Sequence, residues 1–192
     1  MNTKEFLDAK EKAMKSLNDA CNDQSVDEEI LSLLRVLNGI DGCYTSSSCA
    51  GRIVVLEIPE IGDKRGASFL GIWHRVITSE EVNAAASKAT KGLLWLLAQS
   101  PILHVGVRSF ELADQLVKCA VSCGFKNSAV KSTGKKIVIE IGSTERLDAP
   151  IGEDGDLFCD QRFLMLLVDI ANTVIERSAQ KLVRFERGLG NI

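Results

Sequence analysis

Two stretches of the chain have the same order of residue types, and this repetition limits the possible fold more than any other feature. In residues 42–58, and again in residues 124–141, a glycine is followed by an aromatic residue, a polar segment and a β-branched run that ends in Glu-Ile. Each stretch follows a helical pattern, and β-branched runs of this kind favour strands. The repetition predicts a duplicated α-β-β-β unit, with copies over about 25–98 and 109–187.

The predicted fold class is α+β, with a mixed β-sheet flanked by helices. Strict βαβαβ alternation is absent, so the chain does not match a doubly wound parallel sheet of the Rossmann type. We expect one α/β domain over residues 1–192. If the two copies are related by a pseudo-symmetry axis, the polar segments 45–50 and 127–133 should lie together across it.

Helical spacing, cap signals and apolar runs predict the individual elements. The first predicted helix covers 2–21, and the second opens at the capping box of Ser25 and Glu28 and stops at Gly39. The third opens at the capping box of Thr78 and Glu81, and its apolar positions run to Leu97. The last two run from Ser109 to Gly124 and over about 156–185. The predicted strands are 52–58, 67–77, 102–107 and 136–141, with shorter candidates at 43–46, 125–131 and 145–149.

Composition excludes several classes of protein. No apolar run reaches the ~18–20 residues that span a bilayer, and no apolar signal segment opens the chain, so we expect a cytoplasmic protein with no membrane partner. The 6 cysteines include no C-x-x-C pair, which argues against a zinc ribbon and for reduced thiols. The net charge of −3 gives no global positive field for nucleic acid. No metal is predicted, because the acids Asp148, Glu153, Asp154 and Asp156 are typical of solvated groups near a helix start.

The polar segment 44–52 is the strongest candidate for a functional centre. It reads Tyr-Thr-Ser-Ser-Ser-Cys-Ala-Gly-Arg, which gives hydroxyls, a thiol, a glycine that lets a ligand approach, and a guanidinium that suits carboxylate or phosphate. We interpret it as a polar turn between two strands. The competing interpretation is a hydrophilic hairpin loop whose side chains satisfy only their own backbone.

Residues 44–53, Tyr-Thr-Ser-Ser-Ser-Cys-Ala-Gly-Arg-Ile, resemble the signature T-S-S-C-S-G-R-I of the wybutosine-synthesis methyltransferase family. Asp27, the run 102–105 with Arg108, and the run 124–128 are similar to that family's other landmarks, in the same order. Ala50 replaces the second Ser of the signature, and Ala129 stands where the family reads Gly. The resemblance implies S-adenosylmethionine as methyl donor, tRNA-Phe as partner, and methylation of N4 of the tricyclic base at position 37. The sequence lacks the G-x-G-type fingerprint of the usual methyltransferase fold, so we expect the fold of this family instead.

Methyl transfer from a sulfonium is an in-line displacement, so the protein must align donor and acceptor and remove one proton. The 2 histidines, His104 and His74, are the candidate catalytic residues. His104 alternates with Leu103 and Val105 and should face the opposite side of its strand. The residues expected to bind cofactor or substrate are Thr45, Ser46, Ser47, Ser48, Cys49, Gly51, Arg52, Arg108, Asn127 and Ser128.

Two other functions stay open at this point. One is a binding module that recognises modified tRNA without catalysis, with Trp95 stacking on a base beside Lys88, Lys91 and Gln99. The other is a hydrolase that uses Ser48 or Cys49 with His104, although no G-x-S-x-G elbow is present. The sequence leaves open which tricyclic intermediate is methylated, which group takes the proton, and which proteins bind this one.

Overall fold

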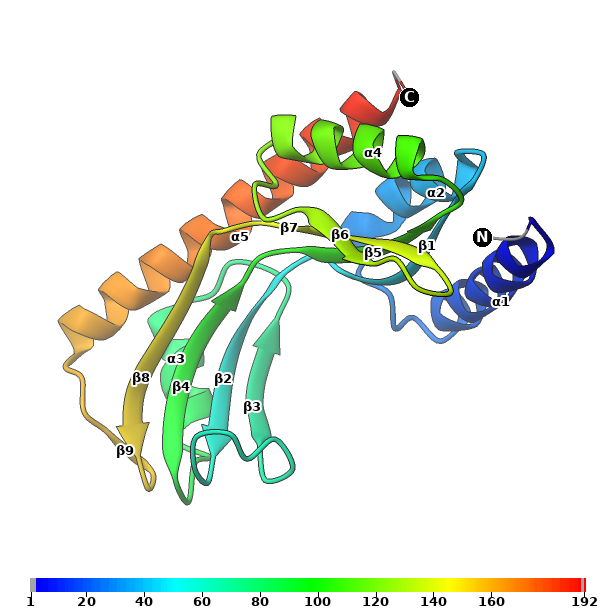
Figure 1. The fold of residues 1–192 in the computed structure, drawn as a ribbon. Helices are drawn as coiled ribbons and strands as arrows, with labels where there is room; N and C mark the ends of the chain where they lie inside the picture. The colour runs from blue at the N-terminus through cyan, green and yellow to red at the C-terminus, as the bar shows by residue number, and fades with distance from the viewer. Residues whose placement is uncertain (1–2, 191) are drawn as a thin grey trace. The chain divides into compact units, whose positions relative to one another are not determined.

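The strands form two separate antiparallel sheets, each covered by helices (Figure 1). The computed structural model describes residues 3–190 and 192. Its chain divides into two compact units: one contains the segment that ends at Ala50, the segment Pro101–Thr144 and the segment that begins at Ser178, and the other contains Gly51–Ser100 and Glu145–Arg177. The predicted α+β class without a Rossmann sheet is confirmed, but the strands do not share one mixed sheet. A single domain over 1–192 stays a prediction.

The first unit has a sheet of order β1-β5-β7-β6. Its strands are β1 (Cys43–Cys49), β5 (Ile102–Val107), β7 (Ile137–Gly142) and β6 (Ala129–Ser132). Alternate residues such as Leu103, Val105 and Ile139 are fully buried against α2 (Leu31–Gly39), α4 (Phe110–Ser122) and the last turns of α5 (Gln161–Leu189). The opposite side of β5 carries His104, as the alternation predicts. Helix α1 (Thr3–Asn22) packs on β1.

The second unit has a sheet of order β3-β2-β4-β8-β9. Its strands are β3 (Ser68–Trp73), β2 (Arg52–Ile58), β4 (Leu93–Gln99), β8 (Arg146–Glu153) and β9 (Asp156–Leu157). Helix α3 (Ser79–Ala86) and the first turns of α5 cover a core that includes Val55, Leu96 and Ala171. The sequence placed the start of α5 too early, because residues 156–157 pair in β9 and the Asp160 carboxylate then accepts a hydrogen bond from the backbone N–H of Phe163.

The helix expected from Thr78 to Leu97 is half wrong. The capping box of Thr78 and Glu81 is present, but α3 ends at Ala86. Gly92 has a positive φ of 85°, and residues 93–99 then continue as β4 between β2 and β8. The leucine-rich run fits both a helical and an alternating pattern, and burial alternates along it as in a strand.

One further helix start also differs from the prediction. Ser25 and Glu28 form no capping box, because the Ser25 hydroxyl donates to the carbonyl of Ala20 and a short 3-10 turn (Glu28–Ile30) precedes α2. The predicted stop of this helix at Gly39 is confirmed. The first predicted helix is present as α1, while its expected start at Asn2 lies outside the described residues.

The internal repeat does not bring its two polar segments together. Residues 45–50 lie in or next to β1 and residues 127–133 lie around β6, and these strands form opposite edges of one sheet. The matched β-branched runs are also placed differently, with β2 in the five-stranded sheet and β7 in the four-stranded sheet. Strand pairing is decided by contacts far apart in sequence, which a local repeat does not specify.

Among the described residues, no helix is both long enough and apolar enough to cross a bilayer.

Candidate functional site

The polar segment forms an edge strand with a bulge and not a turn. Among the described strands β1 pairs with β5 alone, and its register shifts between Thr45, opposite Val105, and Ser47, opposite His104. The extra residue, Ser46, leaves two neighbouring serines exposed beside one histidine. The Ser46 hydroxyl donates to the His104 carbonyl (3.2 Å). The bulge therefore directs consecutive hydroxyls to the same place, which a regular strand would not do.

The start of β1 is anchored in the core. Tyr44 is buried and packs edge-on against Phe6 of α1, with ring centroids 5.4 Å apart. Gly106 lies opposite Tyr44 on β5, and a Cβ at that position would approach the tyrosine Cζ to 2.3 Å. Burial raises the pKa of the neighbouring Cys43 thiol to about 12, so this cysteine is an inert core residue.

A cavity of about 230 Å³ lies between α1 and β1. Hydroxyl groups and one carboxylate supply its polar lining: Ser16, Ser25, Thr45, Ser46, Ser47, Ser48 and Asp27. Asn38 of α2 holds the strand in place, because its side chain accepts from the Thr45 N–H (2.7 Å) and donates to the Thr45 hydroxyl (2.9 Å). The cavity is therefore a polar site with several hydrogen-bonding groups on a fixed strand.

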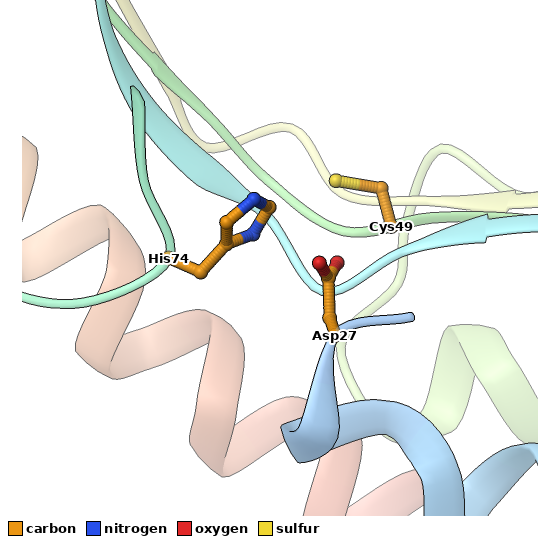
Figure 2. Close-up of side chains that lie close together, drawn as sticks. All are labelled: Asp27, Cys49 and His74. Atoms are coloured by element: carbon orange, nitrogen blue, oxygen red, sulfur yellow. The ribbon is translucent and has the colours of Figure 1, made fainter. Parts of the chain in front are cut away.

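Asp27 lines the cavity and binds the backbone just after the end of β1. Its carboxylate accepts a hydrogen bond from the backbone N–H of Ala50 at 2.7 Å. Figure 2 shows this carboxylate near the Cys49 side chain, in the same unit of the chain. A negative charge thus lies beside the hydroxyls of the cavity, where it favours a ligand that carries positive charge.

A line of hydrogen bonds crosses all four strands of this sheet. The Ser47 hydroxyl lies 2.8 Å from His104 Nδ1, and His104 Nε2 lies 2.8 Å from a Glu140 carboxylate oxygen. Lys131 on β6 donates to the same carboxylate at 3.1 Å. These four residues, one from each strand, are the relay of this site: Ser47, His104, Glu140 and Lys131.

The charge on Glu140 decides which atoms of the relay donate hydrogen bonds and which accept them. The hydrogen bond from Lys131, and after it the bond from His104, keeps the pKa of the Glu140 carboxyl below its usual range. An ionised carboxylate only accepts hydrogen bonds, so the tautomer of His104 that fits this contact carries its proton on Nε2. Its Nδ1 is then an acceptor for the Ser47 hydroxyl. The relay presents a basic nitrogen to the edge of the cavity.

Several predicted site residues lie elsewhere in the first unit. Arg108 does sit between β5 and the Ser109 cap of α4, and its guanidinium pairs with Asp41 at 2.9 Å. Asn127 donates its backbone N–H to the Gly142 carbonyl, while the Ser128 hydroxyl donates to the Phe125 carbonyl. The Asn127–Ser128 turn is next to the sheet edge opposite β1, so it does not join the Ser47 end of the relay.

The remaining predicted residues belong to the second unit. His74 directly follows β3, and its Nδ1 lies 3.0 Å from the Gly51 carbonyl; its ring is the third side chain in Figure 2. Gly51 has a positive φ of 96°, which glycine adopts without strain. Arg52 donates to Gln99 and lies 5.5 Å over the Phe69 ring. Trp95 was expected on a helix but lies in β4, so the predicted helical group with Lys88 and Lys91 does not form.

Sequence reasoning missed Glu140 and Asn38. Glu140 is the Glu of the second Glu-Ile ending, and the predicted strand would have placed it on the face opposite Ile139 and Ile141. That alternation, matched with the alternation around His104, is the signal that could have found it. The hydrolase hypothesis paired His104 with Ser48 or Cys49, whereas the residue on His104 is Ser47.

Fold and site together define an α+β protein with a polar, hydroxyl-lined cavity beside a histidine, on a scaffold that is not a doubly wound sheet. The family model described as methyltransferase TYW3 matches residues 8–191. The chain belongs to this family, and the resemblance to the wybutosine-synthesis methyltransferases is confirmed.

Relatives and solved structures agree with this assignment. A protein of Pyrococcus horikoshii named tRNA(Phe) 7-((3-amino-3-carboxypropyl)-4-demethylwyosine(37)-N(4))-methyltransferase 1 is 47% identical over 185 residues, covering 96% of this chain and 94% of its own. A Methanocaldococcus jannaschii protein of the corresponding name is 35% identical, covering 97% and 98%. The solved structure of the PH1069 protein from Pyrococcus horikoshii has a TM-score of 0.93 at 46% identity, covering 97% of each chain. A hypothetical protein from Aeropyrum pernix has a TM-score of 0.74 at 29% identity, covering 86% of this chain and 98% of its own.

Proposed function

We propose that this protein methylates N4 of a 4-demethylwyosine base at position 37 of tRNA(Phe), with S-adenosylmethionine as donor. The observation that carries the proposal is that the relay from Glu140 through His104 ends at Ser47, which also lines the cavity. A proton acceptor and a ligand site therefore share one residue. The names of the relatives supply the substrate class.

The cavity suits part of such a donor. Its volume of about 230 Å³ is below the ~300–1,000 Å³ of typical ligand sites, so it would hold a portion of the molecule. The hydroxyls of Thr45 to Ser48 can bind polar groups, and the Asp27 carboxylate matches a cationic ligand. When bound, S-adenosylmethionine supplies a methyl group on a positively charged sulfur.

The protein's own residues would manage the proton of the attacking nitrogen. Ser47 can accept that proton from N4–H while its own hydroxyl proton passes to Nδ1 of His104. The imidazolium that results lies against the ionised Glu140, which stabilises the new charge. The donor would supply the methyl group to N4 and leave as a neutral thioether, and His104 would hold the displaced proton until solvent removes it.

Other predicted residues keep binding roles in this proposal. Arg52 and Arg108 are the candidates for phosphate or carboxylate groups of the substrate, including the amino-carboxypropyl group named in the relatives' substrate. Cys49, Gly51, Asn127, Ser128 and His74 stay predicted site residues. A tRNA substrate places the activity in the cytoplasm.

A transfer assay tests the function directly. Purified protein with methyl-labelled S-adenosylmethionine should label tRNA(Phe) that carries the amino-carboxypropyl-4-demethylwyosine base, with the label on N4 by nucleoside mass spectrometry. The same tRNA already methylated at N4 is the matched control and should take no label. Calorimetry of donor binding separates the alternatives, because a non-catalytic tRNA-binding module requires no donor. Absence of transfer together with absence of donor binding would overturn the proposal.

The Glu140→Gln variant tests the relay. We expect the rate at saturating substrate to fall by at least about tenfold, because the imidazolium loses its facing charge while the size of the side chain is kept. The acidic limb of the pH–rate profile should move to lower pH for the same reason. A purely structural role would lower stability without moving that limb.

Lys118→Met is the matched control for this variant. Lys118 forms a surface pair with Asp114 on α4, which is not one of the four strands that carry the relay. Its loss should leave both rate and pH profile unchanged. An unchanged pH profile in Glu140→Gln, with a full rate, would show that His104 works without this carboxylate.

A further inference from the structure

Helix α5 carries a second apolar stripe that faces solvent. Its core side includes Leu164, Leu167 and Ala171, which are buried against the second unit. On another side lie Phe163, Leu166 and Ile170, with exposures of 50%, 52% and 41%. The spacing i, i+3, i+7 aligns these three residues along one helix face. They are called the α5 stripe below.

The surroundings of the α5 stripe extend the apolar surface. Phe158, just before the helix, is 73% exposed. It lines a cavity of about 400 Å³ together with Pro150, Ile151, Cys159, Asp160 and Phe163. Large apolar side chains grouped in this way on a protein surface mark interaction sites more often than single exposed residues do.

Charged groups along the α5 stripe are arranged for an antiparallel copy of the same helix. Arg162 and Asp169 lie on the same flank of the stripe, near its two ends. Within the described part of the chain, neither side chain forms an ion pair. In a symmetric antiparallel pair, equal flanks meet, so Arg162 of each copy lies opposite Asp169 of the other.

We propose that the α5 stripe is the contact between two copies of this chain, related by a two-fold axis near Leu166. Phe163 of each copy then packs toward Ile170 of the other. The cavity beside Phe163 provides room for the incoming Ile170 side chain. The charges along this face are of both signs, with Asp160 and Asp169 beside Arg162 and Arg177, so it offers no continuous positive charge to the phosphates of RNA. One helix pair buries less than a standard interface of ~800 Å² per partner, so the dimer should be weak and concentration-dependent.

Sedimentation velocity over a wide dilution series tests the proposal on the full chain. The wild type should pass from monomer to dimer as its concentration rises, and Leu166→Glu should stay monomeric. Arg162→Asp and Asp169→Arg should each weaken the dimer, because each places like charges opposite one another. The double variant Arg162→Asp/Asp169→Arg should restore it, since both pairs become opposite in sign again.

Controls make each outcome decisive. Val183→Glu changes another exposed apolar residue of α5, 48% exposed, and should dimerise like the wild type. Circular dichroism checks that each variant is folded. If Leu166→Glu does not fold, the charge variants still test the proposal. A wild type that stays monomeric at every concentration, or a double variant that does not recover, overturns the proposal. A loss of tRNA affinity without any change in association would assign the stripe to RNA and overturn it as well.

Discussion

Replacing His104 with alanine is expected to lower the rate of methyl transfer by about 10²–10⁴-fold, the usual contribution of a general base. Donor affinity should be unchanged, because the hydroxyls of Thr45 to Ser48 and the Asp27 carboxylate remain in the cavity. Single-turnover transfer of labelled methyl groups measures the rate, and calorimetry measures the affinity.

The matched control is His104→Gln. A glutamine amide can hydrogen-bond to Ser47 and Glu140 but cannot accept a proton near neutral pH, so this variant should be as slow as His104→Ala while keeping stability. A glutamine variant with wild-type rate would mean that His104 only positions Ser47. Equal loss of donor binding and rate in both variants would assign His104 to the donor site instead.

Gly106→Ala is expected to lower the stability of the fold by overpacking its core. The added Cβ would lie 2.3 Å from Cζ and 2.7 Å from the hydroxyl of Tyr44, which is 2% exposed and packs against Phe6. Overpacking of this kind typically costs about 1–3 kcal/mol. For a chain of this size each kcal/mol lowers Tm by roughly 2–4 °C, so thermal unfolding should show a drop of several degrees.

Two companion variants check the cause. Gly134→Ala should be close to neutral, because no atom lies within 4 Å of its Cβ position. The double variant Gly106→Ala/Tyr44→Leu should lose less stability than the two single variants lose in sum, since leucine lacks the clashing ring atoms. Additive losses would show that the strain arises elsewhere. Donor affinity should fall with Gly106→Ala, because Tyr44 joins α1 to β1 beside the cavity.

The elements that could be predicted were those specified by neighbouring residues. The capping box of Thr78 and Glu81 involves residues three apart, and the structure contains it. The end of the same helix could not be predicted, since Leu93, Leu96 and Leu97 satisfy the helical period while Leu94, Leu96 and Ala98 satisfy the strand period. What decides the matter is that β2 and β8 flank this run and complete its backbone hydrogen bonds.

The residues proposed for the candidate site could be chosen from the sequence, but their arrangement could not. Residues 45–49 were expected to bind, and Thr45 to Ser48 line the cavity, yet Asn127 and Ser128 lie by the opposite edge of the sheet. Glu140 was absent from the prediction because it lies 36 residues from His104, and only the pairing of β5 with β7 brings them together.

The sequence by itself determined the α+β class, the helix caps at Thr78 and Ser109, and the grouping of hydroxyls with His104 as the candidate site. These properties depend on residue type and on spacings of a few residues. Only the tertiary structure decided that Ser47, and not Ser48 or Cys49, faces His104, and that Glu140 lies behind it. The reason is that the side-chain period of a strand is two, so the single extra residue at Ser46 in β1 changes which hydroxyl meets the imidazole.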